Sequence, residues 1–250
     1  METLKPFKIF ITERTKLTSE FHSELNPKFW KNNQLNSEAR DHMLKIAEEW
    51  REYCEIPKSA VDDIYFTGGN ANYNYTKYSD VDIHLVLDMN KINKDHDLLK
   101  DYYIDKKDLW LQNHDINIYG YPVELAAQNK EDLFKKGQGI YSLKKDKWIQ
   151  EPKIEELRKY TKDQIRHKVI FYKYLINKVL KGETDLEKIK SLREKIKNMR
   201  KAGLEKGGEF SFENIVYKEL RNIGLIQKLK DYKYKIMDKS LSLESFKGAL

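Results

Sequence analysis

The sequence predicts an α+β protein: a small mixed β-sheet with helices over residues 1–150, and a C-terminal helical domain over residues 151–250. Two observations indicate this division. Short runs that alternate polar and apolar residues, such as VDIHLVLD at 81–88, occur before residue 150. From Lys153 onward the apolar residues recur at helical spacing. We therefore expect a domain boundary near residues 150–153.

Composition limits the class of protein. A chain of 250 residues with 40% hydrophobic and 12% aromatic residues can bury one sizeable core or two smaller ones. The single cysteine, Cys54, has no partner for an internal disulfide, which favours a reducing compartment and an inert, partly buried thiol. No run reaches the roughly 18 apolar residues that span a bilayer, and the N-terminus lacks the apolar core of a signal peptide. We expect a cytoplasmic protein without a membrane partner, and the sequence does not indicate its oligomeric state.

The N-terminal half is expected to contain two helices and several strands. Residues 7–12 form either a short edge strand or the start of a helix. Ser37 is a candidate N-cap for a helix that ends before Pro57. A strand at 62–67 runs into a glycine turn, and a second strand follows at 81–87. The side chains expected to face the core are Met43, Ile46, Ala47 and Trp50 on the helix, and Val81, Ile83, Leu85 and Leu87 on the second strand.

The remaining elements follow from the same patterns. A helix is expected over residues 94–114, with Leu98, Leu99, Tyr102 and Leu109 toward the core. One or two strands follow at 115–128, broken at 120–122, and a hairpin at 139–152 turns at 144–147. Long helices are expected near 153–181 and 185–202, the second capped by Thr184 or Asp185, and another over about 212–230. The GGEF tetrapeptide at 207–210 is best explained as a glycine helix end.

Two aspartates and two glycines form the most informative cluster. Asp80 and Asp82 lie two residues apart in an alternating stretch, so both project from one face of the strand. Two carboxylates at this spacing can hold hard cations, and magnesium is the expected ion, with Mn²⁺ as an alternative. Upstream, Gly68 and Gly69 allow backbone N–H groups to approach phosphates closely. A helix starting at Asn70 would direct its positive end toward the same phosphates.

A third carboxylate is expected from a neighbouring strand. Glu124 stands between Val123 and Leu125 in YPVELAA, and an acid inside an apolar strand needs a partner or a metal ion. Asp88 and Asp115 are weaker candidates because both stand at strand ends. Two ions held by such carboxylates could clamp the attacking and leaving oxygens of a phosphoryl transfer.

These motifs resemble those of a known superfamily. FTGG followed by SDVDIHLV, over about 22 residues, is similar to the signature of the DNA polymerase β-like nucleotidyltransferases. The stretches ANYNYTKYSDVDIHLV and GLEKGGEFSFEN also resemble a group of phage-encoded predicted nucleotidyltransferases, which would place the protein in the host cytoplasm. The resemblance implies a nucleotidyltransferase core that uses an NTP such as ATP and two Mg²⁺ ions.

The resemblance assigns roles by position. Gly68 and Gly69 match the phosphate-binding turn, Asp80 and Asp82 match the metal ligands, and Glu124 matches the third acid, which often activates the attacking hydroxyl. Gly69 departs from the serine that many members carry, so Thr67 or Asn70 is expected to supply the missing polar group. Among the neighbouring residues, Lys77 is a candidate phosphate contact, His84 a candidate base contact or structural histidine, and Tyr73 and Tyr75 candidates for base stacking or core packing.

Charge bears on the acceptor. Residues 1–150 carry 22 Lys+Arg and 25 Asp+Glu, a net of −3, whereas residues 151–250 carry 25 and 15, a net of +10. The basic half favours a nucleic-acid partner, such as RNA or the end of a tRNA, with Arg166, His167, Lys168, Arg200, Lys201 and Lys206 as candidate contacts. A protein side chain or a small molecule stays open as the acceptor. The alternative from another class is an inactive nucleotidyltransferase fold that binds nucleic acid through its basic half.

Overall fold

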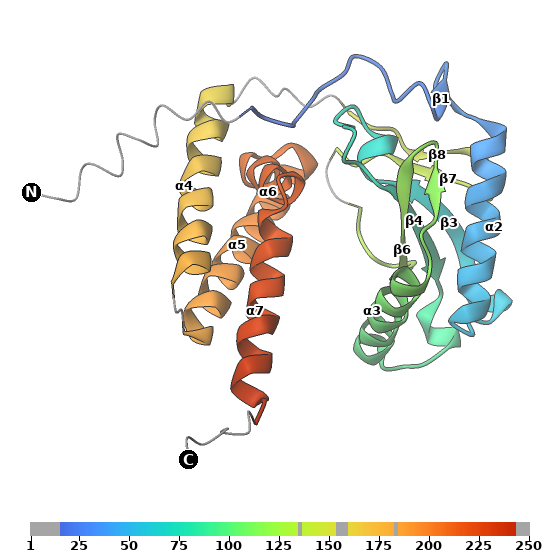
Figure 1. The fold of residues 1–250 in the computed structure, drawn as a ribbon. Helices are drawn as coiled ribbons and strands as arrows, with labels where there is room; N and C mark the ends of the chain where they lie inside the picture. Colours follow the sequence, from blue (N-terminus) through green and yellow to red (C-terminus); the bar gives the residue numbers. More distant parts are fainter. Residues whose placement is uncertain (1–15, 135–136, 154–159, 183–184, 244–250) are drawn as a thin grey trace, which may run out of the picture. The chain divides into compact units, whose positions relative to one another are not determined.

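The computed structural model describes residues 16–134, 137–153, 160–182 and 185–243 (Figure 1). The chain divides into two compact units. We call Ser19–Glu155 the sheet unit, and Glu156–Leu250 together with Met1–Thr18 the helical unit. The expected strand or helix start at 7–12 lies outside the described residues.

A six-stranded mixed sheet forms the centre of the sheet unit. The strands are β3 (Val61–Thr67), β4 (Val81–Leu87), β5 (Asn117–Ile118), β6 (Tyr121–Asn129), β7 (Ile140–Ser142) and β8 (Lys147–Gln150). Their order is β5-β6-β4-β3-β7-β8, and β4 and β6 are parallel while every other pair is antiparallel. A small hairpin of β1 (Trp30–Lys31) and β2 (Gln34–Leu35) precedes this sheet. The predicted α+β class with a small mixed β-sheet is confirmed.

Two helices belong to the core on one face of the sheet. Helix α2 (Ser37–Tyr53) and helix α3 (His96–Asn113) contribute buried side chains to the same cluster as the strands. The strand residues of this cluster include the predicted apolar face of β4, which is Val81, Ile83, Leu85 and Leu87. Side chains alternate along a strand, so Asp82 and His84 project from the opposite face. Asp82 and His84 therefore lie on the face of β4 opposite to the apolar side chains that pack with α2 and α3.

The predicted α2 is confirmed with one shift at its start. Asn36 and not Ser37 is the N-cap, because the Asn36 side chain accepts a hydrogen bond from the backbone N–H of Ala39 at 3.1 Å. Met43, Ala47 and Trp50 are buried as expected, and Ile46 is half-buried. Cys54 ends the helix as its C-cap and is 2% exposed, so it is more deeply buried than predicted.

The expected core face of α3 is largely wrong. Leu99, Tyr103 and Trp110 are buried, whereas Leu98, Tyr102 and Leu109 are exposed. Apolar residues occupy adjacent positions along this helix, so two stripes about 100° apart compete. In the folded protein the buried stripe is the one that carries Trp110. The Trp110 ring makes an edge contact with the Tyr53 ring of α2, with ring centroids 5.1 Å apart.

The two predicted strand segments after α3 are confirmed with adjusted bounds. The break between β5 and β6 falls at Tyr119–Gly120, both with positive φ, so Tyr121 and Pro122 already belong to β6. The hairpin of β7 and β8 turns over residues 143–146.

The helical unit consists of four α-helices in its described part. They are α4 (Lys162–Lys181), α5 (Leu186–Gly207), α6 (Phe212–Asn222) and α7 (Leu225–Leu241). Thr161 and Gln164 form a capping box at the start of α4, later than the predicted 153, and residues 154–159 lie outside the described part. Asp185 caps α5, which continues to Gly207, where glycine ends it as predicted.

The prediction of a single helix over 212–230 is wrong, because two helices occupy this stretch. Gly224 adopts a left-handed conformation with φ of 75° and separates α6 from α7. Thr18 belongs to the helical unit although it lies far from the four helices in the sequence. Its backbone N–H and its hydroxyl donate hydrogen bonds to the buried carboxylate of Glu219 on α6, at 2.8 and 2.9 Å. None of the helices in the described ranges has both the length and the apolar character needed to cross a bilayer.

Candidate metal and nucleotide site

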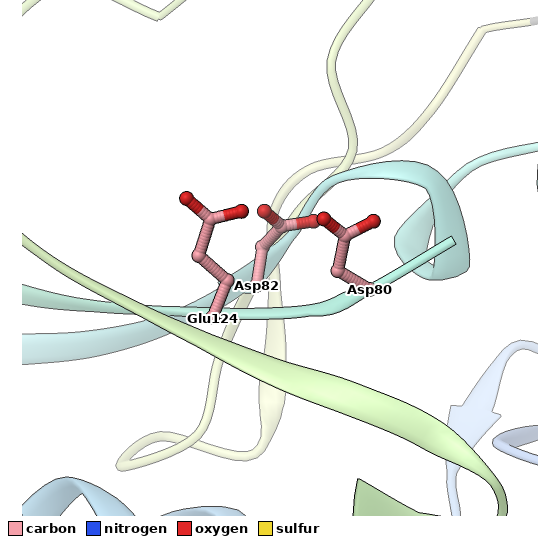
Figure 2. Close-up of side chains that lie close together, drawn as sticks. All are labelled: Asp80, Asp82 and Glu124. Carbon is pink, nitrogen blue, oxygen red and sulfur yellow. The ribbon is translucent and has the colours of Figure 1, made fainter. Parts of the chain in front are cut away.

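Strand pairing brings the three predicted carboxylates together. In the parallel pair of β4 and β6, Asp82 lies directly across from Glu124. Asp80 stands two residues before Asp82, just ahead of β4. One oxygen from each of the three side chains lies within 4.8 Å of the others, and all three residues are half-buried. Figure 2 shows the three carboxylates projecting from the same side of the sheet, so they form one cluster.

The dimensions of this cluster fit a divalent cation. Oxygen ligands of a small divalent ion such as Mg²⁺ lie about 2.1 Å from the metal, so two of them can be at most about 4.2 Å apart. Oxygens within 4.8 Å of one another reach that geometry with small side-chain rotations. All the donors are carboxylate oxygens, which select hard cations over the softer ions that histidine and cysteine bind. The cluster could therefore hold one ion, or two that share a carboxylate.

A lysine from α3 accompanies the acidic cluster. Lys107 Nζ lies 3.4 Å from Glu124 Oε1, and the two side chains are 22% and 42% exposed. Three carboxylates this close repel one another, and Lys107 offsets part of that repulsion. Lys107 was not among the residues predicted from the sequence. Its signal was its position on the inward stripe of α3, four residues after Tyr103 and three before Trp110, where a charged residue is unexpected.

The glycine turn contacts the metal-binding strand directly. Thr67, the last residue of β3, pairs with Asp82 in the antiparallel register. The next residue, Gly68, has φ of 78°, and a β-carbon there would lie 1.7 Å from Asp82 Oδ2. A β-carbon on Gly69 would lie 2.8 Å from the hydroxyl oxygen of Ser79. Both glycines thus allow the turn to lie against the strand that carries the carboxylates.

Asn70 orders the turn from inside the protein. Its side chain is fully buried, donates to the carbonyl oxygen of Asp80 at 2.9 Å and accepts from Asn26 at 2.8 Å. The carbonyl of Asn70 accepts from the Trp30 indole at 2.7 Å. These bonds connect the glycine turn to the backbone of a metal-ligand candidate. Because the Asn70 side chain is already hydrogen-bonded to Asn26 and Asp80, it cannot be the group that contacts a nucleotide in this arrangement. A nucleotide contact by the backbone N–H of Asn70 stays a prediction.

The helix expected to begin at Asn70 is wrong. Gly69–Ala71 form only a single 3₁₀ turn, which is too short to present an N-terminal dipole to a phosphate. The Thr67 hydroxyl is also engaged, because it donates to the carbonyl of Gly139 and accepts from Gln138, both at 2.8 Å. Phosphate binding at this turn would therefore depend on backbone N–H groups.

The other candidate residues surround the cluster in different ways. Lys77 is exposed on a turn, with its ammonium 5.0 Å from the ring centroid of Tyr78, and its phosphate contact stays a prediction. His84 Nδ1 lies 2.6 Å from Gln128 Oε1, one strand over, which gives the histidine a structural partner. Tyr73 packs against the core, and Tyr75 stacks on His22 with centroids 3.8 Å apart. Core packing is confirmed for Tyr73, and base stacking by Tyr75 stays a prediction.

Comparison with known proteins gives little additional information. Neither a protein-family model nor a curated protein matches the sequence. Among solved structures, the chain is similar to a STING-associated CdnE c-di-GMP synthase from Capnocytophaga granulosa, at 15% identity and a TM-score of 0.22. The match covers 84% of this chain and 85% of that one. A likeness this distant carries no functional argument, which depends instead on the residues of the site.

Proposed function

We propose that the protein is a Mg²⁺-dependent nucleotidyltransferase that moves a nucleoside monophosphate from an NTP to an acceptor hydroxyl and releases pyrophosphate. The observation that supports this proposal is the convergence of Asp80, Asp82 and Glu124 beside the Gly68 turn. Carboxylates that hold divalent ions, next to a turn that can approach phosphates, are the components of a phosphoryl-transfer site.

Each group has a distinct task in this reaction. Asp80 and Asp82 would hold the ions, and Glu124 would serve as a third ligand and orient the acceptor. Bound Mg²⁺ would supply the positive charge that offsets the triphosphate. The backbone N–H groups of Gly68 and Gly69 would bind the β- and γ-phosphates. Positioning and electrostatic stabilisation thus account for most of the rate enhancement.

The chemical step is an in-line substitution at phosphorus. The acceptor oxygen forms a bond to the α-phosphorus as the bond between that phosphorus and the oxygen bridging to the β-phosphate breaks. Pyrophosphate leaves, and the hydroxyl proton passes to a carboxylate oxygen of Glu124. Lys107, 3.4 Å from that carboxylate, would offset part of the negative charge of the cluster before the ions bind.

The acceptor we propose is RNA, with a tRNA end as one candidate. Residues 151–250 carry a net charge of +10, and a polyanion is the partner that such a charge favours. A protein or small-molecule acceptor would use the same chemistry at the same carboxylates. The second candidate function is an inactive fold that only binds nucleic acid. The three convergent carboxylates favour the enzyme, because binding alone would not require them to lie together.

The test is nucleotide transfer in vitro. The protein is incubated with each α-³²P-labelled NTP, Mg²⁺ and total cellular RNA, and label is followed into RNA, protein and small-molecule fractions. The wild type is compared with Asp80→Asn/Asp82→Asn, which keeps the side-chain shape. The control is Asp115→Asn, since Asp115 is exposed and bonds only to Asn117 among the described residues.

The outcomes separate the candidates. Label in RNA that disappears in Asp80→Asn/Asp82→Asn, by at least about a hundredfold, and persists in Asp115→Asn supports the proposal. Label in the protein or small-molecule fraction would keep the chemistry and replace the acceptor. Absence of label in every fraction with every NTP, combined with salt-sensitive RNA binding, would establish the inactive binding fold.

A further inference from the structure

The helical unit contains a groove whose charged lining residues are mostly cations. Helices α5, α6 and α7 enclose a groove of about 640 Å³. Its charged lining residues are Lys190, Arg193, Lys197, Arg200 and Lys233, together with Glu187 and Glu194. One of the lysines is already paired, because Lys190 Nζ lies 2.7 Å from Glu187 Oε1. The groove therefore has a surplus of positive charge.

Four of these cations form one row along α5. Lys190, Arg193, Lys197 and Arg200 are three, four and three residues apart, which places them on one side of the helix. Ten residues of α-helix rise about 15 Å, so the row is longer than a single phosphate group and can follow several phosphates of a strand. Arg193 and Lys197, at its centre, form no ion pair with any residue in the described ranges.

The floor of the groove is apolar and aromatic. Ile196, Ile226 and Leu229 line it beside Tyr217. The Arg200 guanidinium lies 4.4 Å from the centroid of the Tyr217 ring, and its Nε donates to Asn214 Oδ1 at 3.3 Å. An arginine held against a tyrosine in this way gives a planar surface on which an unpaired base can stack. A duplex would offer its phosphates but not its base faces, so the groove favours a single strand.

RNA offers this groove two kinds of group that other polyanions lack in combination, which are the ribose 2′-hydroxyl and unpaired bases. Glu194 and Ser191 line the groove beside the cations of the α5 row. A carboxylate there repels phosphates but can accept a hydrogen bond from a ribose 2′-hydroxyl, which DNA lacks. An acidic peptide would match the charge of the row but would offer no bases to the Tyr217 side.

We infer that this groove is a binding site for single-stranded RNA, with phosphates along the α5 cations and a base at Arg200–Tyr217. The inference concerns the helical unit alone and does not depend on catalysis at the acidic cluster. Binding is therefore expected to survive in Asp80→Asn/Asp82→Asn, in the absence of any NTP.

The test uses the full chain and a fluorescent single-stranded RNA of about 20 nucleotides, with binding followed by anisotropy between about 50 and 200 mM salt. Arg193→Ala/Lys197→Ala removes two cations from the row. Lys188→Ala/Lys195→Ala is the matched control, since it removes the same charge from exposed α5 positions that do not line the groove. Tyr217→Leu removes the aromatic ring but keeps an apolar side chain.

Specific results are expected from each variant. Arg193→Ala/Lys197→Ala should bind roughly tenfold more weakly, and the slope of log affinity against log salt should become shallower by about 1.4. Tyr217→Leu should weaken binding at least about fivefold without changing that slope, because stacking releases no counterions. The control should bind as the wild type does, and circular dichroism should show the same helix content in all four proteins.

Three results would overturn the inference. Equal losses in the groove variant and its control would show that RNA responds only to overall charge. Equal affinity for a DNA strand of the same sequence would overturn the choice of RNA. Affinity for polyglutamate as high as for RNA would indicate an acidic protein partner in its place.

Discussion

Gly68 lies directly against the carboxylate of Asp82, so closely that a β-carbon on Gly68 would be 1.7 Å from Asp82 Oδ2. The turn that can bind phosphates and the strand that can bind metal are therefore in contact, because Thr67 and Asp82 pair across β3 and β4. The two parts of the site are consequently coupled: an enlarged turn would displace a metal ligand.

This coupling predicts the effect of Gly68→Ala. The substitution should abolish nucleotide transfer and weaken Mn²⁺ binding, measured by calorimetry, at least about tenfold, because the new methyl group displaces the Asp82 carboxylate. Because φ of 78° and ψ of −159° at Gly68 define a conformation essentially restricted to glycine, the substitution should also lower the free energy of unfolding by about 1–3 kcal/mol.

Gly120→Ala separates these two effects. Gly120 has a similar φ of 82°, but no atom lies within 4 Å of its would-be β-carbon. We expect a similar loss of stability in urea unfolding, with metal binding and transfer intact. If Gly120→Ala also lost metal binding, backbone strain and not the contact with Asp82 would explain the Gly68 result.

The acidic cluster predicts how stability depends on bound metal. Without metal, loss of the two aspartate charges should not destabilise the protein, whereas with Mn²⁺ only the wild type should be stabilised. In EDTA, Asp80→Asn/Asp82→Asn should unfold at or above the wild-type temperature, because like charges within 4.8 Å are removed, a gain on the order of 1 kcal/mol. In Mn²⁺ at about 100 times its dissociation constant, the wild type should gain about 2.7 kcal/mol and the variant almost nothing. Differential scanning calorimetry in both buffers provides the measurement. A variant less stable than the wild type in EDTA would indicate that these aspartates hold the fold together without metal.

Much of the site could be predicted from the sequence because its signals are local. Asp80 and Asp82 are two residues apart, and the glycine turn immediately follows β3. Glu124 was predicted because an acid stood out in an apolar strand, and the parallel register with β4 then placed it opposite Asp82. In each case the strand period determines the direction of the side chain.

The helices show where this approach fails. On α3, apolar residues stand at both Leu98 and Leu99, so periodicity alone could not choose the buried stripe, and tertiary packing chose the Trp110 side. For the same reason Lys107 could not be predicted as a site residue, since its partner Glu124 lies 17 residues away on another element. The role of Asn70 was also hidden, since its partners Asn26 and Asp80 come together only through the fold.

Lys107 predicts an effect on metal affinity. Lys107→Met should tighten Mn²⁺ binding about two- to tenfold in calorimetry without nucleotide, because a positive charge 3.4 Å from Glu124 repels the incoming ion. The partly exposed ion pair contributes little to stability, so the free energy of unfolding should change by less than about 1 kcal/mol. Lys106→Met is the control, since Lys106 lies over the Tyr53 ring at 4.8 Å instead. Unchanged or weaker Mn²⁺ binding in Lys107→Met would mean that the lysine orders Glu124 as a ligand more than it repels the ion.

Cys54 and Tyr103 predict a loss of stability at alkaline pH. Burial raises the pKa of Cys54 from 9.0 to about 12, and burial followed by the charge of Cys54 raises the pKa of Tyr103 from 10.0 to about 12. Both groups therefore stay protonated in the folded protein while they ionise in the unfolded chain. Their stabilising effect is fully present below pH 9 and is lost as the pH rises from about 9 to 12.

The measurement is urea unfolding at pH 8, 9, 10 and 11. The wild type should lose stability progressively above pH 9, and Cys54→Ala should show a shallower decline, because one of the groups whose pKa is raised by burial is gone. Cys54 should also react with a thiol reagent such as Ellman's reagent only at the rate of unfolding, since it is 2% exposed. Tyr234→Phe, which removes an exposed tyrosine of the helical unit, is the control and should leave the decline unchanged. An identical decline in Cys54→Ala and the wild type would show that Cys54 ionisation does not couple to folding.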